Sequence, residues 1–423
     1  MRFIHTSDWH IGQTLHQFER AAEHQAFLDW LVLTLVRERV DALLIAGDIF
    51  DTANPSASAQ KQFYRFLQQA KAALPQLDIV IIAGNHDSPG RLEAPLPLLE
   101  GMQIHVIGAV PRDAAGAIEL ARLVVPLHEA DGSIAAWCIA MPFLRPGDVP
   151  RLPAPTAEAE AQAAAAPDPY LAGIALLYQQ ATAHARGLRS AAQPLIAMGH
   201  CHMVGGEISA ESERSIVIGG SEALSAALFD SDIAYAALGH LHLSQQVARQ
   251  AHLRYCGSPL PLSFAEIDYP HQVLRVDLAS DGTSVVTPLP VPRAVALLRV
   301  PRQPAPLAQV LVALTALDVP SDIALELQPY LEVRVKLTAP EPGLRSAIET
   351  ALEGKAVRLA KIDISFVQQQ ADGAPAVLLE DLAQLQPEHI FERLYQQHYA
   401  AETPAALHAA FAELLLTTER STL

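Results

Sequence analysis

The chain has 423 residues, of which 50% are hydrophobic and 18% are charged, so it is neither mainly disordered nor fibrous and can bury a sizeable core. Its net charge of −17 is unlike that of most nucleic-acid-binding proteins and counts mildly against DNA, unless bound cations or a basic partner supply positive charge. Three widely spaced cysteines favour a reducing compartment. With no signal-peptide pattern and no apolar run of about 18 residues, we expect a cytoplasmic protein that does not enter a membrane.

Strands and helices alternate along residues 1–285, a pattern that is typical of a layered α/β domain. We expect strands at Arg2–Thr6, Val40–Ala46, Asp78–Ala83, Pro194–Met198 and Ala234–Leu238. Helical spacing of apolar residues predicts helices at Ala22–Arg37, Ala59–Ala73 and Pro169–Arg186. The Ala- and Pro-rich residues 146–168 interrupt this pattern; we interpret them as a surface insertion, or alternatively as a solvated helix over 156–166.

After a proline-rich stretch the pattern changes, and residues 290–370 indicate a small α+β module. Its expected strands are Ala294–Val300, Tyr330–Leu337 and Val357–Val367, and its expected helices are Pro306–Leu317 and Gly343–Leu352. A linker near 371–376 leads into residues 377–423, where two amphipathic helices begin at Pro387 and Pro404. These helices either pack on their own domain or dock on another chain.

One local pattern recurs five times: an apolar strand ends, a small residue or a turn follows, and a side chain that can bind a metal comes next. The five endings are Asp8-Trp9-His10, Gly47-Asp48, Gly84-Asn85-His86-Asp87, Gly199-His200 and Gly239-His240-Leu241-His242. Because parallel strands deliver their carboxyl ends to one edge of a sheet, we expect these side chains to share a pocket. Carboxylate, amide and imidazole ligands without thiolate suit Mn²⁺, Fe or Zn²⁺, and their number suits two ions roughly 3.5–4 Å apart.

Each ending alone has an ordinary explanation, since Gly-Asp after a strand is commonly a turn and a single His is often structural. The set of five favours a metal site. Two residues next to these motifs have two possible roles each. Trp9 either stacks on a base or packs in the core, and His202 either binds a metal or only lies beside the site. We expect Cys201 to be a buried thiol, and Asp51 and Asp87 to orient ligands without binding the metal.

These motifs resemble those of the calcineurin-like metallophosphoesterases over roughly residues 1–270. The matching segments are Arg2–Gly12, Ala46–Thr52, Ala83–Ser88, Leu238–His242 and Tyr255–Phe264. Within that superfamily the chain is similar to bacterial nuclease subunits that act with a coiled-coil ATPase. Gly-Asn-His-Asp, ending at Asp87, differs from the Gly-Asn-His-Glu that is usual in the protein phosphatases.

The resemblance implies a metallophosphoesterase β-sandwich flanked by helices, a small α+β capping domain and C-terminal helices. It implies two bound Mn²⁺ ions, one held by Asp8, His10 and His242, the other by Asn85, His200 and His240, with Asp48 bridging both. His86 would be the catalytic residue, stabilising developing charge or protonating the leaving oxygen.

The same resemblance implies a DNA nuclease subunit for repair, recombination and replication: a 3′–5′ exonuclease on duplexes and an endonuclease on single strands and hairpins. The capping domain would approach DNA, the C-terminal helices would bind the ATPase, and the chain would form a homodimer within a heterotetramer near the nucleoid. One alternative is another two-metal phosphodiesterase that acts on nucleotides or small phosphodiesters. A scaffold without metals is disfavoured because all seven implied ligands and His86 are present.

Overall fold

The computed structural model describes residues 1–150, 168–207, 209, 223–320 and 322–366, together with the isolated positions 391, 395, 404, 407 and 411. It forms two compact units, Met1–Phe366 and Val367–Leu423. Most of the predicted 146–168 insertion and most of the predicted C-terminal helices lie outside the described residues. In the second unit, Phe391 and Phe411 have helical backbones and stack with ring centroids 4.3 Å apart.

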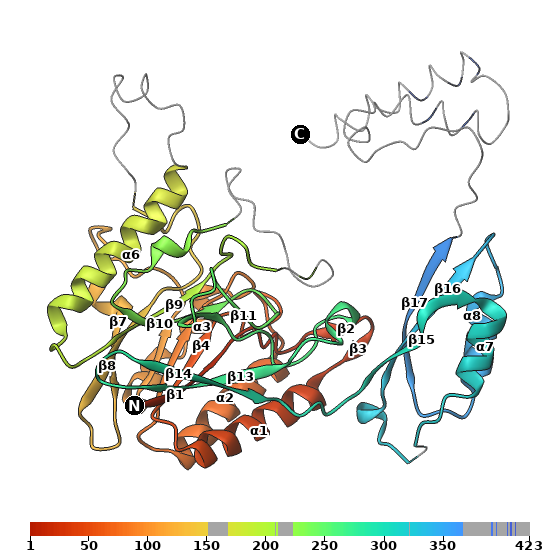
Figure 1. Cartoon of the computed structure of the whole chain (residues 1–423), viewed down its shortest axis with the longest axis horizontal. Coiled ribbons are helices and arrows are strands. Elements are labelled where there is room, and N and C mark those ends of the chain that lie inside the picture. The colour runs from red at the N-terminus through yellow and green to blue at the C-terminus, as the bar shows by residue number, and fades with distance from the viewer. Residues whose placement is uncertain are drawn as a thin grey trace. The chain divides into compact units, whose positions relative to one another are not determined.

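The first unit is built on two six-stranded sheets (Figure 1). The first has the order β14-β13-β1-β4-β5-β6, and its four strands from β1 to β6 are parallel. These strands are β1 (Arg2–Thr6), β4 (Ala42–Ala46), β5 (Asp78–Ile82) and β6 (Ile104–Ile107), and the antiparallel strands are β13 (Gln272–Leu278) and β14 (Ser284–Pro290).

The second sheet has the order β11-β12-β10-β9-β8-β7 and is parallel from β12 to β8. Its strands are β7 (Val124–His128), β8 (Ile134–Ala140), β9 (Leu195–His200), β10 (Ile233–Gly239), β11 (Gln245–Gln246) and β12 (Leu253–Tyr255). A two-stranded ribbon of β2 (Thr14–Leu15) and β3 (Phe18–Glu19) follows β1. The predicted sandwich is confirmed, although several of its strands were not predicted from the sequence.

Alternate side chains along each central strand enter two different cores, as the strand period requires. In β4, Leu44 joins the core shared by the two sheets, whereas Leu43 and Ile45 join a core with the helices that cover the first sheet. Those helices are α1 (Ala21–Glu38) and α2 (Ala57–Ala73), and α6 (Pro169–Leu188) packs on the second sheet. The short helices α3 (Pro89–Glu93) and α4 (Leu96–Leu99) lead into β6. Burial on both faces explains the continuous apolar runs of β4 and β5.

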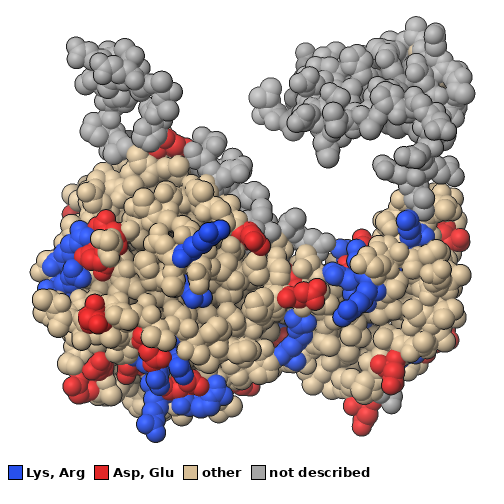
Figure 2. All heavy atoms as spheres, in the orientation of Figure 1, with Lys and Arg blue, Asp and Glu red and all other residues tan. Residues whose placement is uncertain are grey.

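The predicted α+β module contains a parallel sheet of β15 (Leu297–Pro306), β16 (Tyr330–Leu337) and β17 (Arg358–Phe366). Its helices α7 (Leu307–Thr315) and α8 (Leu344–Ala351) cover one face of the sheet. Strand β15 runs six residues past its predicted end at Val300, through Pro301, Pro304 and Pro306, which an edge strand tolerates. In Figure 2, Lys and Arg side chains gather on the side of this module that carries the sheet.

The module and the sandwich share a small core of Leu15, Phe264, Val295, Leu297, Tyr330 and Ala360. Hydrogen bonds also join them: the Tyr330 hydroxyl donates to Glu23 Oε1 at 2.7 Å, Arg299 Nη2 donates to the Phe264 carbonyl at 2.7 Å, and Gln17 Nε2 donates to the Leu359 carbonyl at 3.2 Å. Among the described residues, none of the helices is both long and apolar enough to cross a membrane.

Candidate metal centre

The predicted side chains leave two sheets, not one, at a common edge. Strands β1, β4 and β5 of the first sheet are followed by Asp8 and His10, by Asp48, and by Asn85 and His86. Strand β9 of the second sheet ends at His200, and β10 is followed by His240 and His242. The expectation that parallel strand ends meet is correct, but the pocket lies where the edges of both sheets converge.

The turns that carry these residues have unusual backbones. Asp8, His10, Asp48 and His240 have φ angles of 55°, 46°, 50° and 105°, a region that residues with a Cβ rarely adopt. Glycines next to them are required by space: a Cβ on Gly84 would overlap the Asp48 carboxylate, and one on Gly47 would overlap the His200 ring. The glycines that precede the ligands therefore allow close approach of backbone and ligand.

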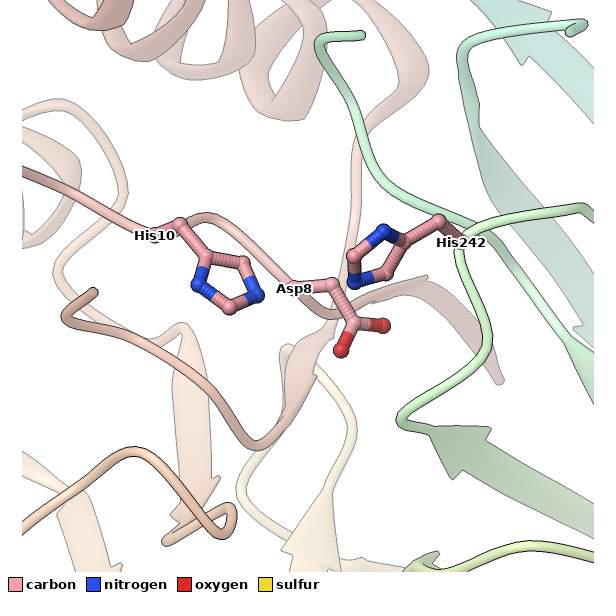
Figure 3. Close-up of side chains that lie close together, drawn as sticks. All are labelled: Asp8, His10 and His242. Carbon is pink, nitrogen blue, oxygen red and sulfur yellow. The ribbon is translucent and has the colours of Figure 1, made fainter. Parts of the chain in front are cut away.

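Three groups of potential ligand atoms form at this edge, each with its atoms within 4.8 Å of one another. Asp8, His10 and His242 make the first group, and Figure 3 shows their side chains converging from β1 and from the segment after β10. The other two groups are Asp8 with Asp48 and His200, and His10 with Asp48 and His86. Asp48 therefore belongs to the second and third groups, and Asp8 is shared by the first and second.

Distances around Asp48 support that placement. Its Oδ2 lies 3.6 Å from His10 Nε2 and 3.4 Å from His200 Nε2. The Asn85 Oδ1 atom lies 3.0 Å from His200 Nε2 and 3.2 Å from His240 Nδ1. All seven predicted ligands thus lie in one connected cluster, and His86 is beside it, with its ring 4.8 Å from that of His10.

Burial and mutual charge shift the pKa values of the cluster. Burial alone would lower the pKa of His200, but the Asp48 carboxylate raises it to about 9. The opposite holds for Asp48, because His200 and His10 overcome its burial and keep its pKa far below the usual range. Burial raises the pKa of Asp8, and burial together with the charge of His200 lowers that of His240. Asp48 and His200 therefore favour their charged forms, whereas burial favours the neutral forms of Asp8 and His240.

The residues fit a cation on independent grounds. His10 is 2% exposed, and among the described residues neither of its ring nitrogens has a well-formed hydrogen bond. A buried polar atom without a partner is costly, and a metal ion bound by one imidazole nitrogen removes that cost. The donor set of carboxylate, amide oxygen and imidazole suits a divalent ion of intermediate softness.

Hydrogen bonds on one ring nitrogen orient several histidines of the cluster and its neighbour His86. His200 Nδ1 donates to the Ala46 carbonyl at 2.8 Å, and His86 Nδ1 donates to the Asp51 carbonyl at 2.7 Å. His242 Nδ1 lies 2.8 Å from Glu266 Oε1. The sequence did not predict a role for Glu266; the only signal was its place two residues after the matched segment that ends at Phe264.

Asp87 does not belong to any of the three groups in the described part of the chain; its carboxylate accepts the backbone N–H groups of Ile49, Phe50 and Gly84. It therefore ties the turn after β4 to the turn after β5, in keeping with the predicted supporting role. Asp51 Oδ1 lies 3.3 Å from His10 Nδ1.

Packing and burial bear on three neighbours of the cluster. Trp9 is fully buried against Phe27, Phe63 and Phe66, so the packing alternative is confirmed. The ring of His202 lies 6.3 Å from that of His240 and, within the described residues, outside the three ligand groups. Burial raises the pKa of the Cys201 thiol to about 12, which disfavours a thiolate ligand.

Comparison with known proteins agrees with this geometry. Residues 1–244 match the calcineurin-like phosphoesterase family, and residues 293–399 match the family described as type 5 capsule protein repressor C-terminal domain. The fold and the cluster at the sheet edges thus define a calcineurin-like phosphoesterase, an enzyme that hydrolyses phosphoesters with the help of metal ions.

Longer matches identify the group within that class. The chain is 40% identical to SbcD, the D component of nuclease SbcCD, from Rhodobacter capsulatus over 392 residues, covering 92% of this chain and 93% of the relative. It is 33% identical to SbcD of Escherichia coli K12, covering 93% and 92% of the two chains. The Bacillus subtilis protein of the same name is 37% identical over 66% of each chain. The chain therefore belongs to the SbcD family of nucleases.

Proposed function

We propose that this nuclease cleaves DNA at a centre of two divalent ions and acts as a 3′–5′ exonuclease on duplex ends and an endonuclease on single strands and hairpins. The observation that carries the proposal is the convergence of seven potential ligands and His86 at the edges of two sheets. The ligand groups overlap through Asp8, His10 and Asp48, and so many potential ligands suit two ions better than one.

In the proposed assignment, one ion would be held by Asp8, His10 and His242, the other by Asn85, His200 and His240, and Asp48 would bridge them. We propose Mn²⁺ for both ions because the family resemblance implies it, and the oxygen and imidazole donors without thiolate are compatible with it. Bound there, the ions would activate a water molecule and stabilise the charge of the phosphodiester transition state.

His86 would act on the leaving oxygen. Its Nδ1–H donates to the Asp51 carbonyl at 2.7 Å, which fixes the ring, so a proton on the imidazolium that is available for transfer sits on Nε2. Its backbone N–H also donates to Asp48 Oδ1 at 2.9 Å, which ties the catalytic residue to the bridging carboxylate. His86 would therefore hold and deliver a proton beside the ions without binding them.

The α+β module of residues 290–370, called the capping module below, supports DNA as the substrate despite the acidic net charge of the chain. Alternate residues of β16 place Glu332, Arg334 and Lys336 on the face of the sheet opposite α7 and α8. Arg299 and Lys361 pair with Glu332 on that face, at 2.5 and 3.4 Å. Together with the pair Arg334–Asp363, this leaves an excess of positive charge on one face, which suits a phosphate backbone.

We also propose that residues 377–423 bind an SbcC-like coiled-coil ATPase and that the chain forms a homodimer within a heterotetramer. Support comes from the name of the relatives, which describes them as one component of SbcCD, and from the family match that extends to residue 399. A cytoplasmic, nucleoid-associated complex for repair, recombination and replication would follow from this assembly.

The test is cleavage of a linear duplex labelled at its 3′ or 5′ end by the purified chain with Mn²⁺, with and without the ATPase partner and ATP. Degradation that starts at 3′ ends, depends on the metal and is stimulated by the partner is expected, with a chelator and the His86→Ser variant as controls. Rapid hydrolysis of a small phosphodiester without DNA cleavage would instead favour a different two-metal phosphodiesterase.

A further inference from the structure

We propose that Glu266 is a positioning residue for the first metal site, where it holds the ring of His242 with Nε2 directed at the ion. This proposal rests on the proposed function, because it assumes that His242 binds a metal. In Figure 3 one nitrogen of the His242 ring faces Asp8 and the other points away from it.

The contacts of Glu266 fix the tautomer of His242. Glu266 is 0% exposed, its Oε1 lies 2.8 Å from His242 Nδ1, and its Oε2 accepts the backbone N–H of Leu262 at 2.8 Å. Because Oε2 acts as an acceptor and Oε1 faces a ring nitrogen, the arrangement is that of a carboxylate receiving two N–H groups. Nδ1 therefore carries the proton, and Nε2 is the nitrogen with a lone pair for the metal.

The backbone around Glu266 is also held. Its carbonyl accepts the N–H of Tyr269 at 3.0 Å and lies 3.0 Å from His271 Nε2. The adjacent turn is tied to the capping module, since the Phe264 carbonyl accepts from Arg299 at 2.7 Å. The carboxylate therefore sits on a fixed support and is able to impose one orientation on His242.

At the second metal site, the ring of His200 is oriented by a backbone group. There the Nδ1–H of His200 is held by the Ala46 carbonyl, a backbone group that no substitution removes. Glu266 performs this task with a side chain and adds a buried negative charge beside His242. Its removal should therefore weaken the first site selectively.

A glutamine separates the positioning role from simple packing. Glu266→Gln keeps the shape of the side chain, but its amide offers one acceptor and one donor where both neighbours present N–H groups. If the amide oxygen stays on Leu262, the amide N–H₂ faces His242 Nδ1 and favours the tautomer with the proton on Nε2, which does not bind a metal. If the amide is turned round, the hydrogen bond to Leu262 is lost instead.

The experiment titrates the full-length metal-free chain with Mn²⁺ and follows free Mn²⁺ by electron paramagnetic resonance. Wild type should bind two ions, whereas E266Q should bind one of them about 10–100-fold more weakly and keep the other unchanged. Cleavage by E266Q should recover as Mn²⁺ is raised. The matched control is Glu23→Gln, another buried core glutamate, which bonds Arg20 and Tyr330 and should leave both affinities unchanged.

Thermal unfolding without metal checks the fold of each variant. Should E266Q fail to fold, Glu266→Asp replaces it: the charge remains but is withdrawn by one methylene, and the same site should weaken. The proposal would be overturned, with the proposed function left intact, if folded E266Q bound both Mn²⁺ ions with wild-type affinity. The same holds for E266D where that variant replaces E266Q. A wild-type chain that binds no ion would remove the proposed function as well.

Discussion

The sandwich and the capping module both present ionisable side chains at a sheet, but they treat them in opposite ways. In the sandwich, Asp8, Asp48 and His200 are at most 2% exposed and lie within 4.8 Å of one another. In the capping module, Lys336 is exposed and its neighbour Arg334 is half-buried. Burying like charges together is costly unless an ion compensates them, whereas exposed charges interact with a partner over longer distances and are screened by salt.

This contrast suggests that the buried cluster carries the cleavage chemistry, whereas the exposed face of the capping module contributes to DNA binding. Substitutions in the buried cluster should have large effects on metal binding or on turnover, because each ligand occupies a fixed position. Substitutions on the exposed face should have small, graded effects that depend on ionic strength.

The largest effect is expected for Asp48→Ala. Asp48 lies between His10 and His200, so its loss should disrupt both ion sites, the second more severely, and lower the cleavage rate by about 10³-fold or more. Calorimetric titration with Mn²⁺ and a cleavage assay would measure this. Retention of two tightly bound ions in the variant would remove Asp48 from its bridging role.

His86→Ser should separate chemistry from metal binding within the same cluster. We expect cleavage to fall by about 10²–10⁴-fold, the usual contribution of a general acid, while two Mn²⁺ ions still bind. His202→Ser is the matched control, because that imidazole lies near His240 but outside the ligand groups of the described chain, and it should cleave almost normally. Loss of an ion from the His86 variant would instead make this residue a ligand.

The positions of the clustered side chains in the sequence explain which features could be predicted and which could not. The clustering of the proposed ligands was recoverable because each lies at the end of a strand or within a few residues after it, so a local pattern carries it, as in Gly84-Asn85-His86. The assignment of strands to sheets was not recoverable: β9 and β10 look like β4 and β5 in sequence, yet they belong to the second sheet. Pairing between distant strands depends on tertiary packing that no local pattern records.

Glu266 was missed for the same reason. Its partner His242 is 24 residues away in sequence, and nothing in the segment around Glu266 distinguishes it from a surface carboxylate. In the capping module, the helices were predicted within about one turn, whereas the predicted strand ended at Val300 and β15 continues through Pro301 and Pro304. Edge position, which permits those prolines, is a property of the folded sheet.

Burial of His5, which is not one of the proposed metal ligands, should make the stability of the fold depend on pH. It links the two sheets, since its Nδ1 lies 3.0 Å from the Tyr235 hydroxyl and its Nε2 lies 3.2 Å from the Leu238 carbonyl. Burial lowers its pKa from 6.5 to about 3. Below pH 6.5 His5 therefore binds a proton in the unfolded chain, but in the folded chain it does so only near pH 3. The contribution of neutral His5 to the free energy of unfolding is thus complete above pH 6.5 and is lost as the pH falls toward 3.

The expected loss from this single group between pH 7.5 and pH 5 is about 2 kcal/mol. Urea unfolding of metal-free wild type and of His5→Gln at both pH values measures it, because glutamine cannot titrate but can still donate and accept. The free energy of unfolding of wild type should fall by about 2 kcal/mol more than that of the variant. Equal losses would show that His5 is protonated in the folded protein.

The smallest effect is expected on the exposed face of the capping module. Lys336→Ala should weaken DNA binding only a few-fold and lower the slope of log affinity against log salt by about 1, as loss of one phosphate contact predicts. Mn²⁺ affinity should not change. Arg345→Ala, on α8 over the other face of the sheet, is the matched control and should leave the salt slope unaltered. Equal slopes for wild type and Lys336→Ala would place the DNA elsewhere and confine the contribution of the capping module to its packing against the sandwich.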